Sequence, residues 1–108
     1  MGERSWINQL DHRARIRARM ALDRQGNVIS FTIQLEYWHR EKWRPVIRYD
    51  SAHGQAHIDY LAPNGREYDK TWLGIFPPFN EAFTIAELEL VNRYDEHIEQ
   101  FLRKETAS

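Results

Sequence analysis

The segment IRYDSAHGQAHID, residues 47–59, gathers ionisable side chains around a single glycine. It holds the candidate catalytic residues, which are Arg48, Asp50, His53, His57 and Asp59. A histidine that a carboxylate orients, as Asp50 would orient His57, has the tautomer and basicity that a general acid or base needs. A neighbouring cation, Arg48 or Lys70, could stabilise a pentacovalent phosphate. This combination predicts a metal-independent, ribonuclease-like cleavage of RNA.

Two other interpretations use the same residues. Two histidines and a carboxylate could hold a divalent metal and leave positions open for water. No motif with strict ligand spacing accompanies them, so we expect no metal and no cofactor. In the structural interpretation, Asp50 caps a hairpin turn, His53 supplies the geometry of that turn and His57 packs on Trp72. The sequence leaves the catalytic and the structural interpretation open.

Arginines and aromatic residues extend the same face. The candidate nucleic-acid-binding residues are Arg15, Arg17, Arg19, Trp38, Lys70 and Trp72. Guanidinium groups beside exposed aromatic rings are typical of platforms for single-stranded nucleic acid, where phosphates meet the cations and bases stack on the rings. Glu36 opposite Arg15, and Asp59 beside Arg48, favour an ordinary solvated face with cross-strand pairs. The sequence leaves both interpretations open.

The elements that position these residues are read from their periodicity. HRARIRARMALD alternates arginine with apolar residues, which predicts a strand over residues 13–22 with one basic face. RQGN is a turn, and VISFTIQLEYWH alternates again over residues 28–39. Pairing the two strands across this turn puts Leu22 opposite Ile29 and every apolar residue on one face.

A bulge signal and two turns define the remaining strands. The third strand covers residues 43–51 with His39 opposite Trp43, and its Pro45 predicts a bulge. Two-residue turns are expected at His53–Gly54 and Asn64–Gly65, because glycine adopts positive φ freely. The resulting cross-strand pairs are Asp50 with His57, Arg48 with Asp59, Asp59 with Lys70, and His57 with Trp72.

Start signals mark one helix near the end of the chain. Thr84 and Glu87 form a capping box, and Phe83 and Leu88 a hydrophobic staple. The apolar stripe expected to face the sheet is Leu88, Val91, Tyr94, Ile98, Phe101 and Leu102. We therefore predict a two-layer α+β domain, a five-stranded antiparallel meander with one C-terminal helix packed on its apolar face.

Length and composition indicate one domain over residues 1–108, with the sheet at about 13–73, a crossover at 74–83 and the helix at about 85–103. Residues 1–11 are expected to form a loose tail or a short leading helix. The chain has no cysteine, which excludes disulfides and thiolate metal sites and favours a reducing cytoplasm. It shows no export signal and no apolar run near the roughly 18 residues of a membrane span.

Charge is distributed unevenly. Residues 1–48 carry ten Lys/Arg and five Asp/Glu, a net of +5, whereas residues 49–108 carry five and eleven, a net of −6. This asymmetry could build a positive face for an anionic partner, or the two halves could neutralise each other.

From about Arg13 to Phe101 the chain resembles a family of small bacterial proteins that share a domain of unknown function. The resemblance rests on a hairpin that reads RYD, then HG, then H-x-D, followed by a P-[DN]-G turn, as in VIRYDSAHGQAHIDYLAPNGREYDK. More distantly, the RYD-then-histidines pattern is similar to small toxins of TumE type, which are encoded beside helix-turn-helix antitoxins and carry a denser histidine cluster. This second resemblance implies a toxin that acts on nucleic acid and is neutralised by a protein partner.

The leading hypothesis is therefore a cytoplasmic bacterial protein of a toxin-antitoxin module that acts on RNA through the hairpin. The alternatives are a non-catalytic module that binds nucleic acid or protein through the same face, and a structural protein that dimerises through its sheet edge or helix. Expected partners are RNA, a helix-turn-helix antitoxin protein or a second copy of the chain, and no membrane.

Overall fold

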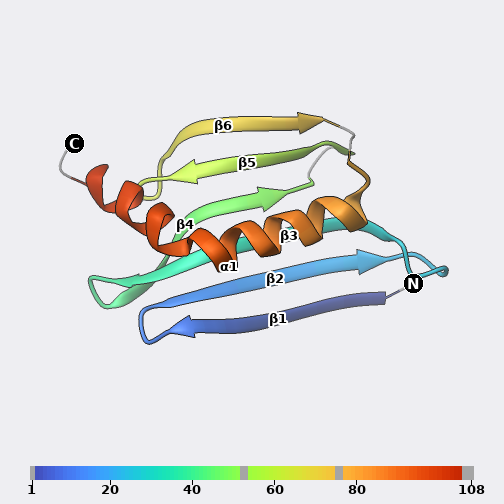
Figure 1. Ribbon diagram of the computed structural model, residues 1–108, viewed down its shortest axis with the longest axis horizontal. Helices are drawn as coiled ribbons and strands as arrows, with labels where there is room; N and C mark the ends of the chain where they lie inside the picture. Colours follow the sequence, from blue (N-terminus) through green and yellow to red (C-terminus); the bar gives the residue numbers. More distant parts are fainter. Residues whose placement is uncertain (1, 52–53, 75–76, 106–108) are drawn as a thin grey trace.

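The computed structural model describes residues 2–51, 54–74 and 77–105, and it shows one antiparallel sheet with one helix on it (Figure 1). The strands are β1 (Gly2–Asp11), β2 (Ala14–Leu22), β3 (Val28–His39), β4 (Lys42–Asp50), β5 (Ala56–Leu61) and β6 (Glu67–Gly74). They follow each other in space in chain order, and α1 (Phe79–Arg103) lies across one face. The predicted two-layer α+β class and the antiparallel meander are confirmed.

The sheet has six strands, so the predicted number of five is wrong. The segment expected to be a tail or short helix is β1, and it pairs along β2 with Trp6 opposite Ala18. Polar residues such as Asn8 face Ile16 in this pairing, so the period-two pattern of β1 is weak. The segment is held as a strand by its pairing with β2 and by the Trp6 ring, which lies 5.7 Å from the Phe83 ring.

The predicted register holds over most of the sheet, with bulges in the β2–β3, β3–β4 and β5–β6 hairpins. Ala18 lies opposite Ile33 and Leu35 opposite Ile47, as expected. A register shift after Ala21 places Leu22 opposite Val28 instead of Ile29, which leaves Ile29 half exposed. The bulge predicted at Pro45 is present. It shifts the end of the β3–β4 hairpin, so that His39 faces Lys42 and Trp38 faces Trp43.

The helix begins at Phe79, and its N-cap is Pro78, six residues before the predicted cap Thr84. Thr84 lies inside the helix, where its hydroxyl donates to the Asn80 carbonyl at 3.1 Å. Proline at a helix start lacks only an N–H that would be unpaired there anyway, and Glu81 in the first turn favours the same start electrostatically. The capping box is therefore a wrong prediction.

The helix also buries a different stripe over its first half. Leu88 and Val91 are exposed, whereas Ala82, Ala86 and Leu90 are buried. Alanines spaced four residues apart let the helix approach the sheet closely. This close packing favours burial of the small alanines over burial of the larger Leu88 and Val91. The backbone leaves helical geometry at Arg93, and after this kink Ile98 and Phe101 are buried as predicted.

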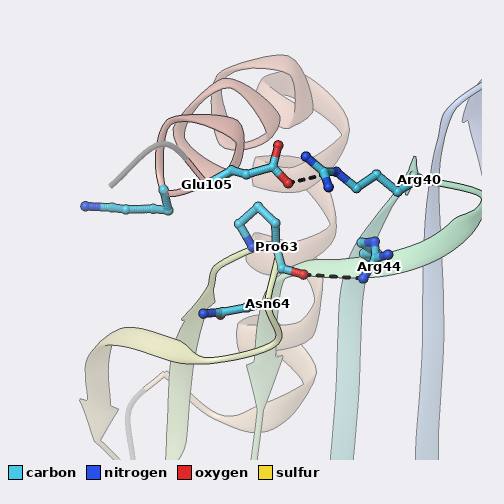
Figure 2. Close-up of a pocket in the computed structure, with 6 residues that line it drawn as sticks. Arg40, Arg44, Pro63, Asn64 and Glu105 are labelled. Atoms are coloured by element: carbon cyan, nitrogen blue, oxygen red, sulfur yellow. Dashed lines mark hydrogen bonds and ion pairs between the residues drawn. The ribbon is translucent and has the colours of Figure 1, made fainter. Parts of the chain in front are cut away.

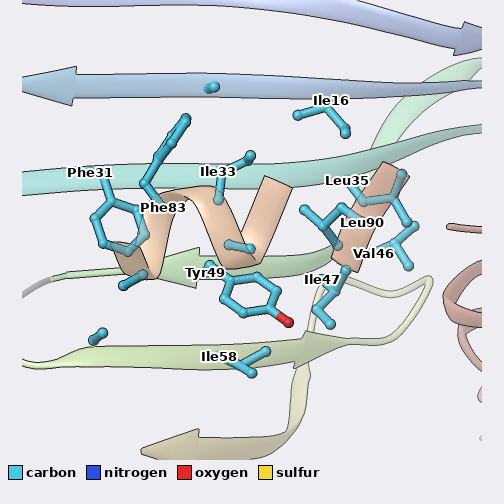
Figure 3. Close-up of a cluster of buried hydrophobic side chains, with 14 of the residues drawn as sticks. Ile16, Phe31, Ile33, Leu35, Val46, Ile47, Tyr49, Ile58, Phe83 and Leu90 are labelled. Atoms are coloured by element: carbon cyan, nitrogen blue, oxygen red, sulfur yellow. The ribbon is translucent and has the colours of Figure 1, made fainter. Parts of the chain in front are cut away.

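The core lies between α1 and the central strands, and the helix packs mainly on β3. Figure 3 shows its side chains, which come from β2, β3, β4, β5 and α1. The largest fully buried ones are Phe31, Phe101, Ile16, Ile33, Leu35, Ile47 and Leu90. Because alternate strand residues point to opposite faces, this core leaves the polar residues of β2 to β6 together on the other face.

Candidate functional site

The polar face is the sheet surface opposite α1, and its side chains form rows that run across the strands. The first row is Arg17, Gln34, Arg48, Asp59 and Lys70, from β2 to β6. The second row is Arg19, Thr32, Asp50, His57 and Trp72. Neighbours in a row have Cβ atoms about 5 Å apart. All four cross-strand pairings predicted around the hairpin are therefore present in the register.

Three ionisable residues of this face are buried, although an exposed strand surface was expected. Glu36 is 6% exposed, His57 5% and Asp59 7%. Burying a charge is costly unless partners compensate for the lost water. Every buried side-chain nitrogen or oxygen within the described residues has a hydrogen-bond partner.

Glu36 is the centre of the first cluster. Its carboxylate accepts hydrogen bonds from Arg15 Nε at 2.7 Å, from Arg17 Nε at 3.1 Å and from Gln34 Nε2 at 2.6 Å. Burial alone would raise the pKa of Glu36, but these donors outweigh it and hold the pKa below the ordinary value. Glu36 therefore stays ionised, and its charge organises the arginines of β2.

The three predicted arginines of β2 differ in how they are held. The Arg15 side chain is 17% exposed, and its guanidinium carbon lies 4.1 Å from the centre of the Trp43 ring. Arg15 therefore has a structural role in the fold. The Arg17 and Arg19 side chains are 51% and 53% exposed. Arg19 also contacts the exposed Glu3 at 3.1 Å. Two of the three predicted arginines thus remain accessible to a ligand.

Shallow hollows flank the two accessible arginines. One of about 170 Å³ is lined by Arg17 and Arg19 together with Thr32 and Gln34 of β3. The other, of about 390 Å³, lies toward β1 and includes Ser5, Trp6 and Ile7 in its lining. Arg17 and Arg19 therefore border recessed surface toward both β1 and β3.

The hairpin residues form a second cluster with partners other than those predicted. His57 Nε2 lies 3.4 Å from Asp59 Oδ2, and Lys70 Nζ donates to Asp59 Oδ1 at 2.5 Å. Arg48 faces Asp59 in the register, but its Nε donates to Gln34 Oε1 at 2.7 Å, so the predicted side-chain pair of Arg48 with Asp59 is wrong. The long Lys70 side chain reaches Asp59 from β6, while the Gln34 amide offers Arg48 an acceptor from β3.

Gln34 joins the two clusters, because its oxygen accepts from Arg48 while its nitrogen donates to Glu36. Burial would raise the pKa of Asp59, yet the hydrogen bond from Lys70 and the charge of His57 contribute to lowering it. Asp50, the partner predicted for His57, lies directly opposite it in the register. The imidazole nevertheless approaches the Asp59 carboxylate.

His57 is covered by its neighbours. The Trp72 ring lies 5.1 Å from the imidazole centre, as the structural interpretation predicted, and the backbone oxygen of Gln55 lies 3.4 Å from Nδ1. A general base must contact the proton that it removes. The burial of this ring therefore favours a positioning role over direct contact with a substrate. His53 lies outside the described residues.

The predicted turn at His53–Gly54 lies partly outside the described residues. β4 ends at Asp50 and β5 starts at Ala56, while Gly54 has the expected positive φ, at 77°. Ser51, which the sequence did not single out, is 5% exposed and anchors this connection. Its hydroxyl accepts from Phe31 N at 2.7 Å and donates to Phe31 O at 3.2 Å. Serine next to a turn is the only sequence signal for this role.

The predicted aromatic positions are exposed but far apart. Trp72 is 57% exposed and Trp38 39%. Trp38 packs edge-on against Trp43 at 5.5 Å, near the β3–β4 turn. Trp72 lies in the row of Thr32, which is about 20 Å from Trp38 along β3 at 3.4 Å per residue. A single short ligand segment would meet one of these rings.

The described residues offer little for a metal ion. Within them, no three His, Cys, Asp or Glu side chains are grouped as metal ligands would be. The same part of the chain contains no helix that is both long enough and apolar enough to cross a membrane.

Fold and face together define a class, an α+β protein with a six-stranded meander whose open face carries a hydrogen-bonded network of charged residues. The chain belongs to the family described as domain of unknown function DUF7718, whose model matches residues 1–107. No curated protein and no solved structure matches the sequence. The family supplies no activity, and the link to TumE-type toxins stays a prediction.

Proposed function

We propose that the chain binds single-stranded RNA on its polar face. The observation that carries this proposal is the pair Arg17 and Arg19, two half-exposed cations on the same side of β2 that border hollows toward both neighbouring strands. Residues two apart on a strand lie about 7 Å from each other. Two guanidinium groups at this spacing suit neighbouring phosphates, which each accept paired N–H donors.

Trp72 extends the proposed interface. It stands at the other end of the row that contains Arg19, four strand spacings or about 19 Å away. An RNA strand that crosses the sheet along this row would place phosphates near Arg19 and a base on the exposed Trp72 ring. Stacking of one base on such a ring contributes about 1–3 kcal/mol and tolerates any sequence.

The test compares two double variants that each remove two positive charges. Arg17→Gln with Arg19→Gln should weaken binding of a fluorescent single-stranded RNA, measured by anisotropy. The slope of log affinity against log salt should become shallower by about 1.4, because about 0.7 counterions are released per phosphate contact. The control carries Arg24→Gln and Arg66→Gln, two exposed arginines in turns outside the polar face. Equal loss in both variants, or no binding by the unmodified protein at low salt, would refute the proposal.

RNA cleavage is the second candidate function. The observation in its favour is the contact of His57 with Asp59 beside Lys70, a base, an orienting carboxylate and a cation within one cluster. As a metal-independent ribonuclease, the chain would use His57 as the base and Lys70 or Arg48 to stabilise the pentacovalent phosphate. Its buried ring would have to gain access to the substrate past Trp72.

Cleavage is tested on His57→Ala and Asp59→Asn, which alter the base and the carboxylate that contacts it. A catalytic role requires that both variants fold and that His57→Ala abolishes cleavage of labelled RNA, with a milder loss for Asp59→Asn. If both retain the full rate of the unmodified protein, the hairpin has a structural role and the face only binds.

The biological setting proposed is a bacterial cytoplasm, where the chain would be the toxin of a two-gene module and a helix-turn-helix protein its antitoxin. The absence of cysteine and the TumE-like order of RYD and histidines support this setting. Inducing the chain in bacteria should arrest growth and alter total RNA, and co-expression of the adjacent gene product should restore growth. Unchanged growth would leave the runner-up functions, a non-catalytic binding module or a dimerising protein.

A further inference from the structure

A second polar site lies at one end of the sheet, where three segments distant in sequence meet. It is a pocket of about 410 Å³ between the β3–β4 turn, the turn after β5 and the C-terminal end of α1 (Figure 2). Its lining residues are Arg40, Arg44, Pro63, Asn64, Lys104 and Glu105. It shares no residue with the polar face and goes beyond the proposed RNA binding.

The lining carries three cations and one carboxylate. Arg40 Nε lies 3.1 Å from Glu105 Oε2, and His39 Nε2 donates to the same oxygen at 3.0 Å. The hydrogen bond from His39 is the main reason why the pKa of Glu105 lies below its ordinary value. This corner of the fold therefore already stabilises one oxyanion, supplied by the chain itself.

Arg44 is held in place before any ligand arrives. Its Nε donates to the His39 carbonyl at 2.8 Å, and its Nη1 lies 3.4 Å from the Pro63 carbonyl, as drawn in Figure 2. A guanidinium group has five N–H donors in a planar fork, so these two contacts leave donors for a ligand. A preorganised fork loses less entropy on binding than a mobile one.

The turn that presents Arg40 is strained. Arg40 and Glu41 have φ values of 53° and 65°, in the left-handed region that favours glycine. Residues in such conformations persist where surrounding contacts hold them, and they are enriched at ligand sites. The ion pair of Arg40 with Glu105 is one such contact, and it directs the guanidinium group toward the pocket (Figure 2).

We propose that this pocket binds the terminal phosphate of a phosphomonoester, and that the Glu105 carboxylate occupies the phosphate position while the pocket is empty. A phosphate dianion offers three terminal oxygens and more charge than a carboxylate, so it competes well for arginine forks. The pocket volume exceeds that of a phosphate group and lies in the range of small-molecule sites, which leaves room for the organic part.

The probes are adenosine 5′-monophosphate, adenosine and inorganic phosphate, titrated at constant ionic strength into the full chain and followed by amide NMR shifts. Saturable shifts around residues 40–44 and 63–64 are expected with the monophosphate and with phosphate, and none with adenosine. A short RNA with and without a 5′-phosphate distinguishes a free small molecule from an RNA end as the source of the phosphate. Equal shifts with adenosine and its monophosphate, or no saturable shift with any phosphate, would overturn the proposal.

Substitutions in the pocket should change phosphate affinity in opposite directions. Arg40→Gln should weaken phosphate binding about tenfold, the value of one charge-assisted hydrogen bond. Glu105→Gln should tighten it, because the competing carboxylate is gone. Arg103→Gln, next to the pocket in sequence but outside its lining, is the matched control and should bind as the unmodified chain does. Should Arg40→Gln disturb the turn, Lys104→Gln supplies the same charge change at the helix end.

Two outcomes reject the assignment. The first is a loss for Arg103→Gln equal to that for Arg40→Gln or Lys104→Gln, which would mean unspecific attraction by net charge. The second is weaker phosphate binding by Glu105→Gln, since a carboxylate that competes with the ligand cannot also support it. Because neither Arg17 nor Arg19 is altered, failure here is distinguishable from failure of RNA binding on the polar face.

Discussion

The polar face should respond strongly to Glu36→Gln, which keeps the shape of the side chain but removes its charge. Glu36 is 6% exposed and accepts three hydrogen bonds, one of them from Arg15, whose side chain is 17% exposed. A hydrogen bond to a charged group contributes about 1.5–3 kcal/mol when it is shielded from water. The bond from Arg17 contributes less, because that side chain is 51% exposed and screened by solvent. We expect a loss of about 2 kcal/mol in the free energy of unfolding.

This loss is measurable by thermal unfolding. An unfolding entropy of about 2.1 cal/mol/K per residue implies about 0.23 kcal/mol/K for 108 residues, so the melting temperature should fall by about 9 °C. The control is Glu3→Gln, which breaks the exposed pair with Arg19 and should cost less than about 0.5 kcal/mol. Losses of equal, small size in both variants would mean that the polar face is an ordinary solvated surface.

We also expect Glu36→Gln to change how the stability of the protein depends on pH. The pKa of Glu36 is lower in the folded chain than its ordinary value of 4.5, so the ionised form stabilises the fold. That contribution is complete above about pH 4.5 and is lost as the pH falls through the lower folded value. The unmodified protein should therefore lose stability on acidification below this point, and Glu36→Gln should lose less. Parallel acid curves for the two proteins would contradict the reasoning.

Two further predictions concern the helix and a turn, and both are read from chemical denaturation. Leu90→Ala should lower the free energy of unfolding by about 2–5 kcal/mol because Leu90 is fully buried. Leu88→Ala, at 57% exposure, should lower it by less than about 1 kcal/mol. The reverse order would mean that the helix buries the stripe expected from sequence. Glu41→Gly should stabilise the chain by up to about 1 kcal/mol by relieving the positive φ of 65°, and Gly65→Ala, at a φ of 86°, should destabilise it. Stabilisation by Gly65→Ala would show that backbone strain does not govern these turns.

Sequence alone was sufficient for the rows of the polar face. Strict alternation along β2 and β3 allows only one side to be apolar, and a shift of one residue would reverse both faces. Short turns then relate each strand to the next, which is why His57 opposite Trp72 and Asp59 opposite Lys70 could be predicted. The bulge at Pro45 was predictable for an equally local reason, since proline lacks the N–H of a ladder residue.

Other features depend on contacts between distant segments, and no local pattern reports them. β1 is a strand because it pairs with β2 and because Trp6 packs against Phe83. The helix turns Ala82 and Ala86 toward the sheet because their small side chains permit a close approach. In the polar face, residue types allowed Arg48 to pair with Asp59, but the reach of Lys70 from β6 decided otherwise.

The pocket at the end of the sheet is the clearest case. Residues 40, 63 and 105 belong to two turns and a helix end, and their separation in the chain conceals any shared chemistry. Periodicity places a residue on a face, because that depends only on its neighbours along the chain. Which side chains meet across a corner depends on how the hairpins twist and where the helix ends, and only the tertiary structure determines both.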